Sequence, residues 1–390
     1  MDPRRNPFAP GAGTQPPELA GRDDLIEKAE IALDRIAAGR PARSLILYGL
    51  RGVGKTVLLG KIRSDAEARG LFPVRIEAPE NRSLPAILAA PLRAMLLKLD
   101  RLEAAKTGAK KALRALASFA RLKMKYADIE VSLDLEPLRG TADSGDLELD
   151  LAELLTVVGE AARERETAVV LFLDEIQYVE ESELSALISA LHTVAQEKLP
   201  VTMVAAGLPQ LLGRMGRAKS YSERLFEYVP VGKLDEGAAR VAITRPIERE
   251  GATIEAAAIA EILRATEGYP YFLQEWGKHC WDLAFDETIT LTDAENAGVT
   301  ALAELDSSFF RVRFDRLTPS EKRYIRAMAS LGPGPHRSGD IADAMGKAVN
   351  QLAPIRNSLI RKGMLYSPAH GDTAFTVPMF DQFMKRIMPD

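Results

Sequence analysis

The hydrophobic pattern divides the chain into two parts. Short apolar runs alternate with helical stretches up to about residue 235, and helical stretches dominate afterwards. Three apolar runs are continuous, as expected for strands buried on both faces of a parallel sheet: 44–48, 168–173 and 201–206. Residues 73–77 are predicted as a further strand. Apolar residues at helical spacing predict helices over 22–39, 57–68, from about 85, over 144–166 and over 182–197. This alternation predicts right-handed β-α-β units and a three-layer α/β fold with a parallel sheet.

The stretches after residue 235 form two groups. Helices of a small bundle are predicted over 236–249, 255–267 and 271–285. The last group has helices over 320–331, 338–345 and 348–362, then short strands at 364–367 and 374–377 around Gly371. Because 390 residues exceed the usual size of one core, we predict four units. These are a flexible segment rich in Pro and Gly (1–18), an α/β core (19–234), a helical unit (235–305) and a C-terminal unit (306–390).

A basic insertion interrupts the core at about residues 98–135. Residues 98–125 form a helical stretch with nine Lys or Arg and two Asp or Glu, and residues 128–135 alternate as in a strand or hairpin. A solvated helical face is the usual origin of such a charge run, and a docking surface for nucleic acid or a partner is the alternative.

Residues 49–56 (GLRGVGKT) match the P-loop pattern G-x-x-x-x-G-K-[ST], between a predicted strand and a predicted helix. Glycines let the backbone N–H groups turn toward phosphate oxygens, and the helix N-terminus adds its dipole. Lys55 can place a charge on the β- and γ-phosphates, and the Thr56 hydroxyl can bind Mg²⁺. We therefore predict a site for ATP with Mg²⁺, formed by Gly49, Leu50, Arg51, Gly52, Val53, Gly54, Lys55, Thr56 and Val57.

A carboxylate pair, Asp174 and Glu175, follows the apolar run 168–173. We expect this strand to lie beside the P-loop strand, so that Asp174 reaches the metal. Glu175 would then orient and deprotonate the attacking water, and Lys55 would stabilise the phosphates. The pair alone is a weak signal, and its combination with the P-loop makes it strong.

With these motifs in this order, the sequence resembles the AAA+/STAND group of P-loop ATPases, in the branch with initiator-like (origin-recognition) ATPase domains. Residues 20–23 (AGRD) are similar to the element that lines the adenine site, 171–177 (LFLDEIQ) to the Walker B motif, and 268–271 (GYPY) to a G-x-P element of the lid. The resemblance covers about residues 18–380. It implies that Gly21, Arg22 and Pro270 contact the nucleotide, that the helical unit is a lid, and that the C-terminal unit is a winged helix.

The sequence departs from the AAA+ pattern in two places. Residues 205–208 (AAGL) stand where a polar sensor is expected, and Tyr271 stands near the position of the lid's sensor arginine. Both departures favour a STAND-like switch with slow hydrolysis. Residues 222–226 (SERLF) stand where such proteins often carry an arginine finger, so Arg224 is a candidate catalytic residue. Arg214 and Arg217 are rivals, and pairing with a surface carboxylate is the alternative role.

The C-terminal unit has the element order of a winged helix-turn-helix. In its last helix, Leu352, Ile355, Leu359 and Ile360 are predicted to face the core, and Asn350, Arg356, Asn357 and Arg361 to face outward, as residue types suited to base edges and phosphates. The unit carries thirteen Lys or Arg and eight Asp or Glu, a balance of +5 against −4 for the whole chain. We predict duplex DNA binding through residues 348–377, with protein contact or autoinhibition as the alternative.

Composition narrows the function classes further. The net charge of −4 excludes a globally basic nucleic-acid binder. No apolar run approaches the ~18 residues that cross a bilayer, and the single Cys280 fits a reducing cytoplasm. The leading hypothesis is an ATP-controlled switch that binds DNA or a partner. The alternative is an oligomeric loader or remodeller, a homo-oligomer that relies on an arginine of its neighbour. A small-molecule kinase is a third hypothesis, in which the lid and winged helix have no evident place.

Overall fold

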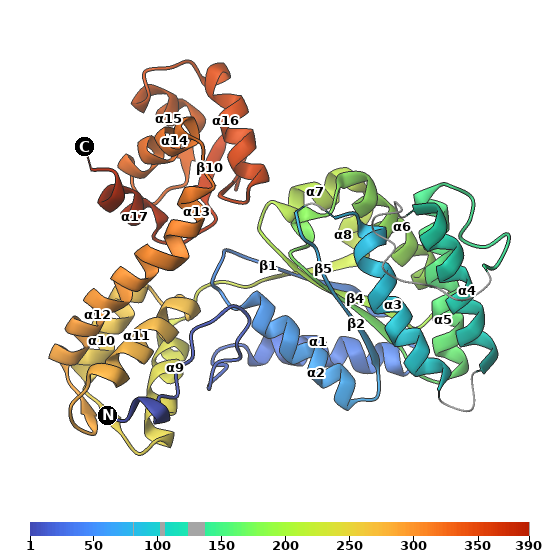
Figure 1. Cartoon of the computed structure of the whole chain (residues 1–390), viewed down its shortest axis with the longest axis horizontal. Helices are drawn as coiled ribbons and strands as arrows, with labels where there is room; N and C mark the ends of the chain where they lie inside the picture. Colours follow the sequence, from blue (N-terminus) through green and yellow to red (C-terminus); the bar gives the residue numbers. More distant parts are fainter. Residues whose placement is uncertain (81, 102–105, 124–136, 390) are drawn as a thin grey trace.

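The computed structural model describes residues 1–80, 82–101, 106–123 and 137–389. The α/β core lies on one side, and the helical unit and the C-terminal unit lie together on the other, with the N-terminus against the helical unit (Figure 1). None of the described helices is long and apolar enough to cross a bilayer.

The core is built on a five-stranded parallel sheet with the order β2-β3-β4-β1-β5. Its strands are β1 (Ser44–Tyr48), β2 (Phe72–Glu77), β3 (Val169–Asp174), β4 (Val201–Gly207) and β5 (Phe226–Pro230). The four predicted strands are confirmed. The fifth, β5, was missed because it is an edge strand whose sequence, FEYVP, mixes polar and apolar residues and is only partly buried.

The predicted neighbour of the P-loop strand was wrong. Strand β4 lies between β1 and β3, so the strand that ends in Asp174 does not pair with the P-loop strand. Uniformly apolar runs contain no information about which strands become neighbours. Asp174 nevertheless reaches the P-loop, because parallel strands end at the same edge of the sheet and the Thr56 hydroxyl donates a hydrogen bond to its carboxylate.

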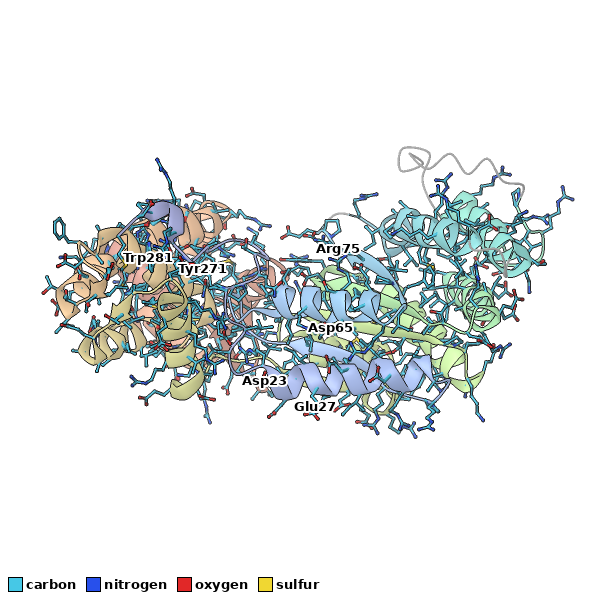
Figure 2. The ribbon with its side chains drawn as sticks, turned by 90° about the horizontal axis from the view of Figure 1, so that it is seen from below. Asp23, Glu27, Asp65, Arg75, Tyr271 and Trp281 are labelled. Carbon is cyan, nitrogen blue, oxygen red and sulfur yellow. The ribbon has the colours of Figure 1, made fainter. Side chains whose placement is uncertain are left out.

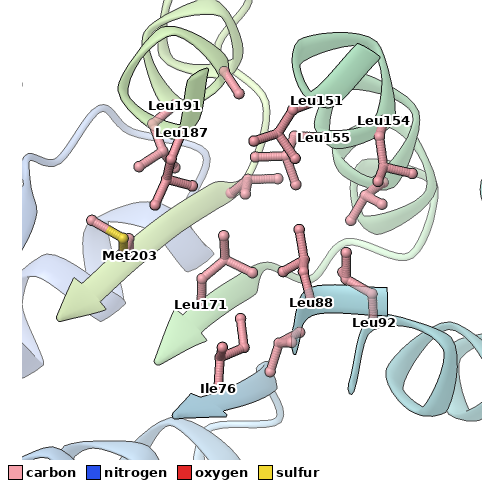
Figure 3. Packing of buried hydrophobic residues seen from close by; sticks show 14 of the residues in the cluster. Ile76, Leu88, Leu92, Leu151, Leu154, Leu155, Leu171, Leu187, Leu191 and Met203 are labelled. Carbon is pink, nitrogen blue, oxygen red and sulfur yellow. The ribbon is translucent and has the colours of Figure 1, made fainter. Parts of the chain in front are cut away.

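Helices cover both faces of the sheet. One face carries α1 (Asp23–Ala37) and α2 (Lys55–Ala68), and the other carries α3 (Leu84–Asp100), α5 (Leu147–Glu164) and α6 (Glu181–Gln196). Helix α4 (Lys106–Lys123) packs on α3 and α5. On the second face, leucines of α3, α5 and α6 pack on Ile76, Leu171 and Met203 of the strands (Figure 3). The 3-10 turn η4 (Ile176–Tyr178) follows β3, and α7 (Leu211–Ala218) and the short α8 (Ser222–Leu225) follow β4.

The basic insertion contains the end of α3 and the separate helix α4. One side of α4 is buried, and Lys110 and Lys111 lie on its exposed side, where Lys111 pairs with Glu160 at 2.9 Å. This arrangement fits the solvated-face interpretation of the charge run. The hairpin predicted over 128–135 lies outside the described residues.

The helical unit contains the three predicted helices and a fourth that was missed. They are α9 (Glu236–Arg249), α10 (Ala256–Thr266), α11 (Pro270–Leu283) and α12 (Leu291–Leu305), with a parallel pair of two-residue strands, β6 (Thr253–Ile254) and β7 (Thr288–Ile289). A capping box between Thr290 and Asp293 starts α12. That start signal is visible in the sequence and could have identified the helix.

The C-terminal unit contains the predicted helices and hairpin, and it adds η5, α13, a strand and a last helix. Its elements are η5 (Asp306–Phe310), α13 (Arg311–Asp315), α14 (Pro319–Ser330), β8 (His336–Arg337), α15 (Ser338–Ala344), α16 (Val349–Arg361), β9 (Leu365–Tyr366), β10 (Asp372–Phe375) and α17 (Phe380–Ile387). The three strands form an antiparallel sheet in the order β8-β10-β9.

One predicted outward-facing residue of α16 has a different role. The Arg356 guanidinium donates hydrogen bonds to the Thr373 hydroxyl at 2.8 Å, and to the Ser367 hydroxyl and the Asp372 carbonyl at 3.0 Å. Arg356 therefore holds the β9-β10 hairpin against α16 and is not free to bind a phosphate. Helical spacing alone does not predict these hydrogen bonds, because they depend on the hairpin that folds back over the Arg356 side chain.

No break separates the helical unit from the C-terminal unit. The chain runs on from α12 through η5 into α13, and one apolar cluster contains residues of both units. Fully buried Phe310 lies at its centre, with its ring 6.2 Å from Phe272 of α11 and 5.2 Å from Phe383 of α17. The boundary predicted at 305/306 therefore falls within a shared core.

The N-terminal residues 1–18, predicted as a flexible segment, pack on the helical unit and include one short 3-10 turn, η1 (Pro3–Arg5). Phe8 is 3% exposed and fills the space beside Gly277 of α11. Glu18 pairs with Arg249 at 2.7 Å and Arg245 at 3.2 Å. The Pro- and Gly-rich composition hid these contacts, because it predicts a lack of regular structure and not a lack of packing.

If the two later units share one core, Phe310→Ala should destabilise both of them. We expect a loss of about 3–5 kcal/mol in the free energy of unfolding, because a buried aromatic ring leaves a cavity. Urea denaturation can be followed by fluorescence, since both tryptophans of the chain, Trp276 and Trp281, lie in α11. Phe285→Ala is the matched control because Phe285 is 94% exposed. Equal midpoints for the two variants would contradict the shared core.

Candidate nucleotide-binding site

A cavity of about 600 Å³ lies at the carboxyl edge of the sheet, where all parts of the chain meet. The P-loop and the ends of β2 and β3 form its floor, and α11, η5 and α13 contribute Pro270, Tyr271, Phe309 and Arg313. The N-terminal segment contributes residues 9–14. Figure 2 shows Tyr271 on the side of the helical unit that faces the core. The volume is typical of a site for a small molecule or cofactor.

The P-loop glycines are required by close approaches and by backbone angles. A Cβ atom at Gly49 would lie 2.0 Å from the Val231 carbonyl oxygen, so no other residue fits there. Gly52 and Gly54 have φ angles of +77° and +90°, in the left-handed region that glycine adopts without strain. The Gly52 carbonyl accepts a hydrogen bond from the Tyr271 backbone N–H at 3.1 Å, which attaches the loop to the helical unit.

Lys55 is held over the P-loop and can turn to a phosphate. Its ammonium donates to the Leu50 carbonyl at 2.7 Å and to the Gly49 carbonyl at 3.0 Å. The residue is 8% exposed, and this burial lowers the pKa of Lys55 to about 8. A bound phosphate would supply the counter-charge that the carbonyl groups supply only in part.

Two side chains with oxygen atoms that can bind a metal ion lie next to each other: Thr56 at the start of α2 and Asp174 at the end of β3. Thr56 donates its hydroxyl hydrogen to Asp174, and burial raises the pKa of the Asp174 carboxyl. Hydroxyl, carboxylate and phosphate oxygens are the ligands that Mg²⁺ takes in phosphate sites, so the donor set fits the predicted metal.

Glu175 is at the cavity but is bound by its neighbours. Its φ of +53° is costly for a residue with a side chain. The Gln177 amide donates to the Glu175 carboxylate, and the Arg51 guanidinium lies 3.6 Å from it. Gln177 also accepts from the Leu208 backbone N–H at 3.0 Å. Gln177 therefore links Glu175 to the residue after β4, but it does not line the cavity, so the polar sensor that residues 205–208 lack is not replaced by Gln177.

None of the three arginine-finger candidates lines the cavity. Arg224 is exposed on α8. Arg214 is half-buried and donates to the carbonyl groups of Gln177 and, at 2.6 Å, Val179, so it supports the turn after Glu175. Arg217 lies 3.5 Å from Glu181.

The remaining predicted residues divide into two groups. Arg22, Pro270 and P-loop residues 51–57 line the cavity, whereas Gly21, Gly49 and Leu50 do not. Arg22 is 9% exposed and donates to the carbonyl groups of Gly232 at 2.5 Å and Val53 at 3.2 Å. It thereby fixes the P-loop against the segment between β5 and α9.

Two parts of the cavity wall were not predicted. In the N-terminal segment, Gly13 lies so close to the metal candidate Thr56 that a Cβ atom would be 3.2 Å from its methyl group. Phe309 and Arg313 come from the segment between α12 and α14. No motif marks either segment, because their positions depend on how the units fold together.

Two family models match the chain. Residues 18–204 match the AAA ATPase domain family, and residues 307–384 match a domain of unknown function (DUF8462). The first match covers slightly less than half of the chain and supports an AAA ATPase domain over residues 18–204. No curated protein matches the sequence. The predicted AAA+ P-loop ATPase is thus confirmed at the level of this domain.

Solved structures extend the likeness in fold beyond the AAA ATPase domain. A Walker-type ATPase of Pyrococcus abyssi aligns with a TM-score of 0.60 at 16% identity, over 95% of this chain and 97% of that chain. The Aeropyrum pernix ORC1 protein in complex with DNA aligns with a TM-score of 0.49 at 13% identity, over 98% of this chain and 96% of that chain. The Thermotoga maritima RuvB Holliday junction branch migration motor aligns with a TM-score of 0.45 at 16% identity, over 93% of this chain and 96% of that chain. Only the first likeness is strong enough to support the shared fold.

The pKa of Lys55 gives the AAA ATPase domain a pH dependence that can be measured. Above pH 8 the free protein loses the Lys55 charge, so ATP must bind together with a proton. We expect the ATP affinity to fall by up to about tenfold per pH unit between pH 8 and 9.5. Lys55→Arg keeps a cation that does not titrate in this range and should remove the pH dependence. Calorimetric titration that gives one wild-type affinity at pH 7 and 9.5 would rule out this role.

Proposed function

We propose that the chain is an ATP-binding, slowly hydrolysing AAA+/STAND-like switch protein that couples its nucleotide state to DNA or partner binding through a C-terminal winged helix. The cavity supports the nucleotide part: a P-loop lysine, a Thr56–Asp174 pair and a carboxylate meet in one site. In this proposal Lys55 balances the charge of the phosphates, Thr56 and Asp174 hold Mg²⁺, and Glu175 positions the attacking water.

The contacts of Glu175 support slow hydrolysis. A general base needs a free lone pair toward the water, and of the roughly four acceptor sites of the Glu175 carboxylate Gln177 uses one while Arg51 faces the other oxygen. Arg51 also donates to the Tyr178 hydroxyl at 2.9 Å. In the proposal these contacts hold the carboxylate in one orientation, and slow hydrolysis follows where that orientation does not suit the attacking water.

A direct contact between the P-loop and the C-terminal unit carries the switch part of the proposal. The Arg51 backbone N–H donates to the Thr376 carbonyl at 2.9 Å, and a Cβ atom at Gly363 would lie 3.0 Å from the Arg51 guanidinium. A second attachment is the ion pair of Arg316 with Glu80 at 2.6 Å. A phosphate that moves the P-loop would therefore act directly on the C-terminal unit.

The order α14-β8-α15-α16-β9-β10 and its three-stranded sheet support the winged-helix assignment. Asn350, Asn357 and Arg361 are exposed on α16, which leaves three of the four predicted outward residues available for a duplex. Arg356 supports the hairpin instead.

One observation favours the alternative of an oligomeric loader or remodeller. Arg224 is exposed and lies outside the chain's own cavity, as required of an arginine that acts on the nucleotide of a neighbouring copy. Turnover that rises with protein concentration and disappears in Arg224→Ala would select this alternative.

The assigned base gives a direct test of hydrolysis. Glu175→Gln should keep ATP affinity but lower turnover by about 10²–10⁴-fold, because the water loses its base. Glu180→Gln, an exposed neighbour, is the control and should hydrolyse ATP at the wild-type rate. A Glu175→Gln variant with unchanged phosphate release would remove Glu175 from the mechanism.

The DNA part is tested by charge reversal on α16. Arg361→Glu should weaken duplex binding without a change in ATP affinity, and each lost phosphate contact should reduce the log–log salt slope by about one unit. Arg40→Glu makes the same change in net charge on the core and should have no effect. Fluorescence anisotropy with random duplexes, with and without ATP, makes the measurement. No duplex binding by the wild type in either state would leave a switch for protein partners.

A further inference from the structure

Arg313 of α13 is a half-buried cation on the wall of the nucleotide cavity. It lies outside the AAA ATPase domain, in the segment matched by the domain of unknown function. Its charge interacts with Glu175, Arg51 and Tyr178, which places it at the end of the cavity that contains the carboxylate pair. In the proposed function this is the end that receives the terminal phosphate.

No acidic side chain in the described part of the chain forms an ion pair with Arg313. Its guanidinium donates to the Phe309 carbonyl and lies 4.1 Å from the centre of the Phe309 ring. Burial, and then the repulsion from Arg51, lower the pKa of Arg313 to about 10. The nearest part of the carboxylate pair, Glu175, already faces Arg51 at 3.6 Å, so Arg313 is a half-buried cation with no acidic partner among the described residues. Such a group is stabilised by any anion that enters the cavity.

We propose that Arg313 binds the terminal phosphate of the nucleotide and so makes the binding of ATP, in contrast to ADP, depend on the C-terminal unit. The inference rests on the proposed function, because it requires that the P-loop binds a nucleotide. It assigns to the domain of unknown function a ligand for the phosphate chain.

The surroundings of Arg313 connect this phosphate contact to the rest of the C-terminal unit. Phe309 stacks on Tyr271 with ring centres 4.8 Å apart, next to the P-loop contact of Tyr271. Three residues beyond Arg313, Arg316 forms its ion pair with Glu80 of the core. A shift of α13 toward a phosphate would therefore change both the contact of Tyr271 with the P-loop and the ion pair of Arg316 with Glu80.

Arg313→Met, which keeps an unbranched apolar stem and removes the guanidinium charge, tests the proposal. A charged hydrogen bond contributes about 1.5–3 kcal/mol, so the ATP affinity should fall by about 10–100-fold. The ADP affinity should change by less than about threefold, because ADP lacks the terminal phosphate. Arg311→Met is the matched control, since Arg311 lies on the same helix but outside the cavity wall. Isothermal titration with each nucleotide gives all four affinities.

A second readout separates a ligand from a structural residue. ATP, but not ADP, should change hydrogen exchange over residues 363–376 in the wild type and in Arg311→Met, and not in Arg313→Met. Equal losses for ATP and ADP, or unchanged affinities for both, would overturn the proposal. If Arg313→Met does not fold, Arg313→Lys should keep part of the preference for ATP. A wild type that binds no nucleotide would overturn the proposed function, whereas normal ATP binding by Arg313→Met overturns only this inference.

Discussion

The P-loop backbone is hydrogen-bonded to both later units of the chain, and the rest of the site depends on this arrangement. The Gly52 carbonyl accepts from Tyr271 of the helical unit, and the Arg51 N–H donates to Thr376 of the C-terminal unit. A P-loop normally needs its N–H groups for phosphate oxygens. Here the Arg51 N–H is already used by another unit, so in the proposed function phosphate binding would compete with the attachment of the C-terminal unit for the same loop.

Charge distribution reinforces this competition. Lys55 and Arg313 both have lowered pKa values, because burial disfavours their charge and the nearby carboxylates compensate only in part. Asp174 has a raised pKa for the corresponding reason. The cavity therefore contains cations and an acid that an incoming phosphate with its metal would stabilise together, and this makes the site responsive to the charge of its ligand.

Much of the site could be predicted because local sequence determines it. The P-loop needs glycines where Val231 approaches and where φ is positive, and Asp174 needs only to follow a buried strand. Strand order was not predictable, because apolar strands resemble each other, and neither was the contribution of Phe8 or Gly13. Arg356 shows the same limit: helical spacing placed it outward, but the hairpin covers it. Arg313 could not be found either, since only the shared core around Phe310 brings α13 to the P-loop.

In the proposed function the cavity binds a nucleoside triphosphate through the P-loop, and every other step depends on this binding. Isothermal titration of the wild type with ATP and Mg²⁺, repeated with Lys55→Ala, tests it most directly. Lys61 of the same helix pairs with Asp65 at 2.5 Å, so Lys61→Ala is a control for the loss of a lysine from α2. We expect one ATP per chain for the wild type and for Lys61→Ala, and for Lys55→Ala an affinity weaker by at least about tenfold. The same affinity for wild type and Lys55→Ala would contradict it.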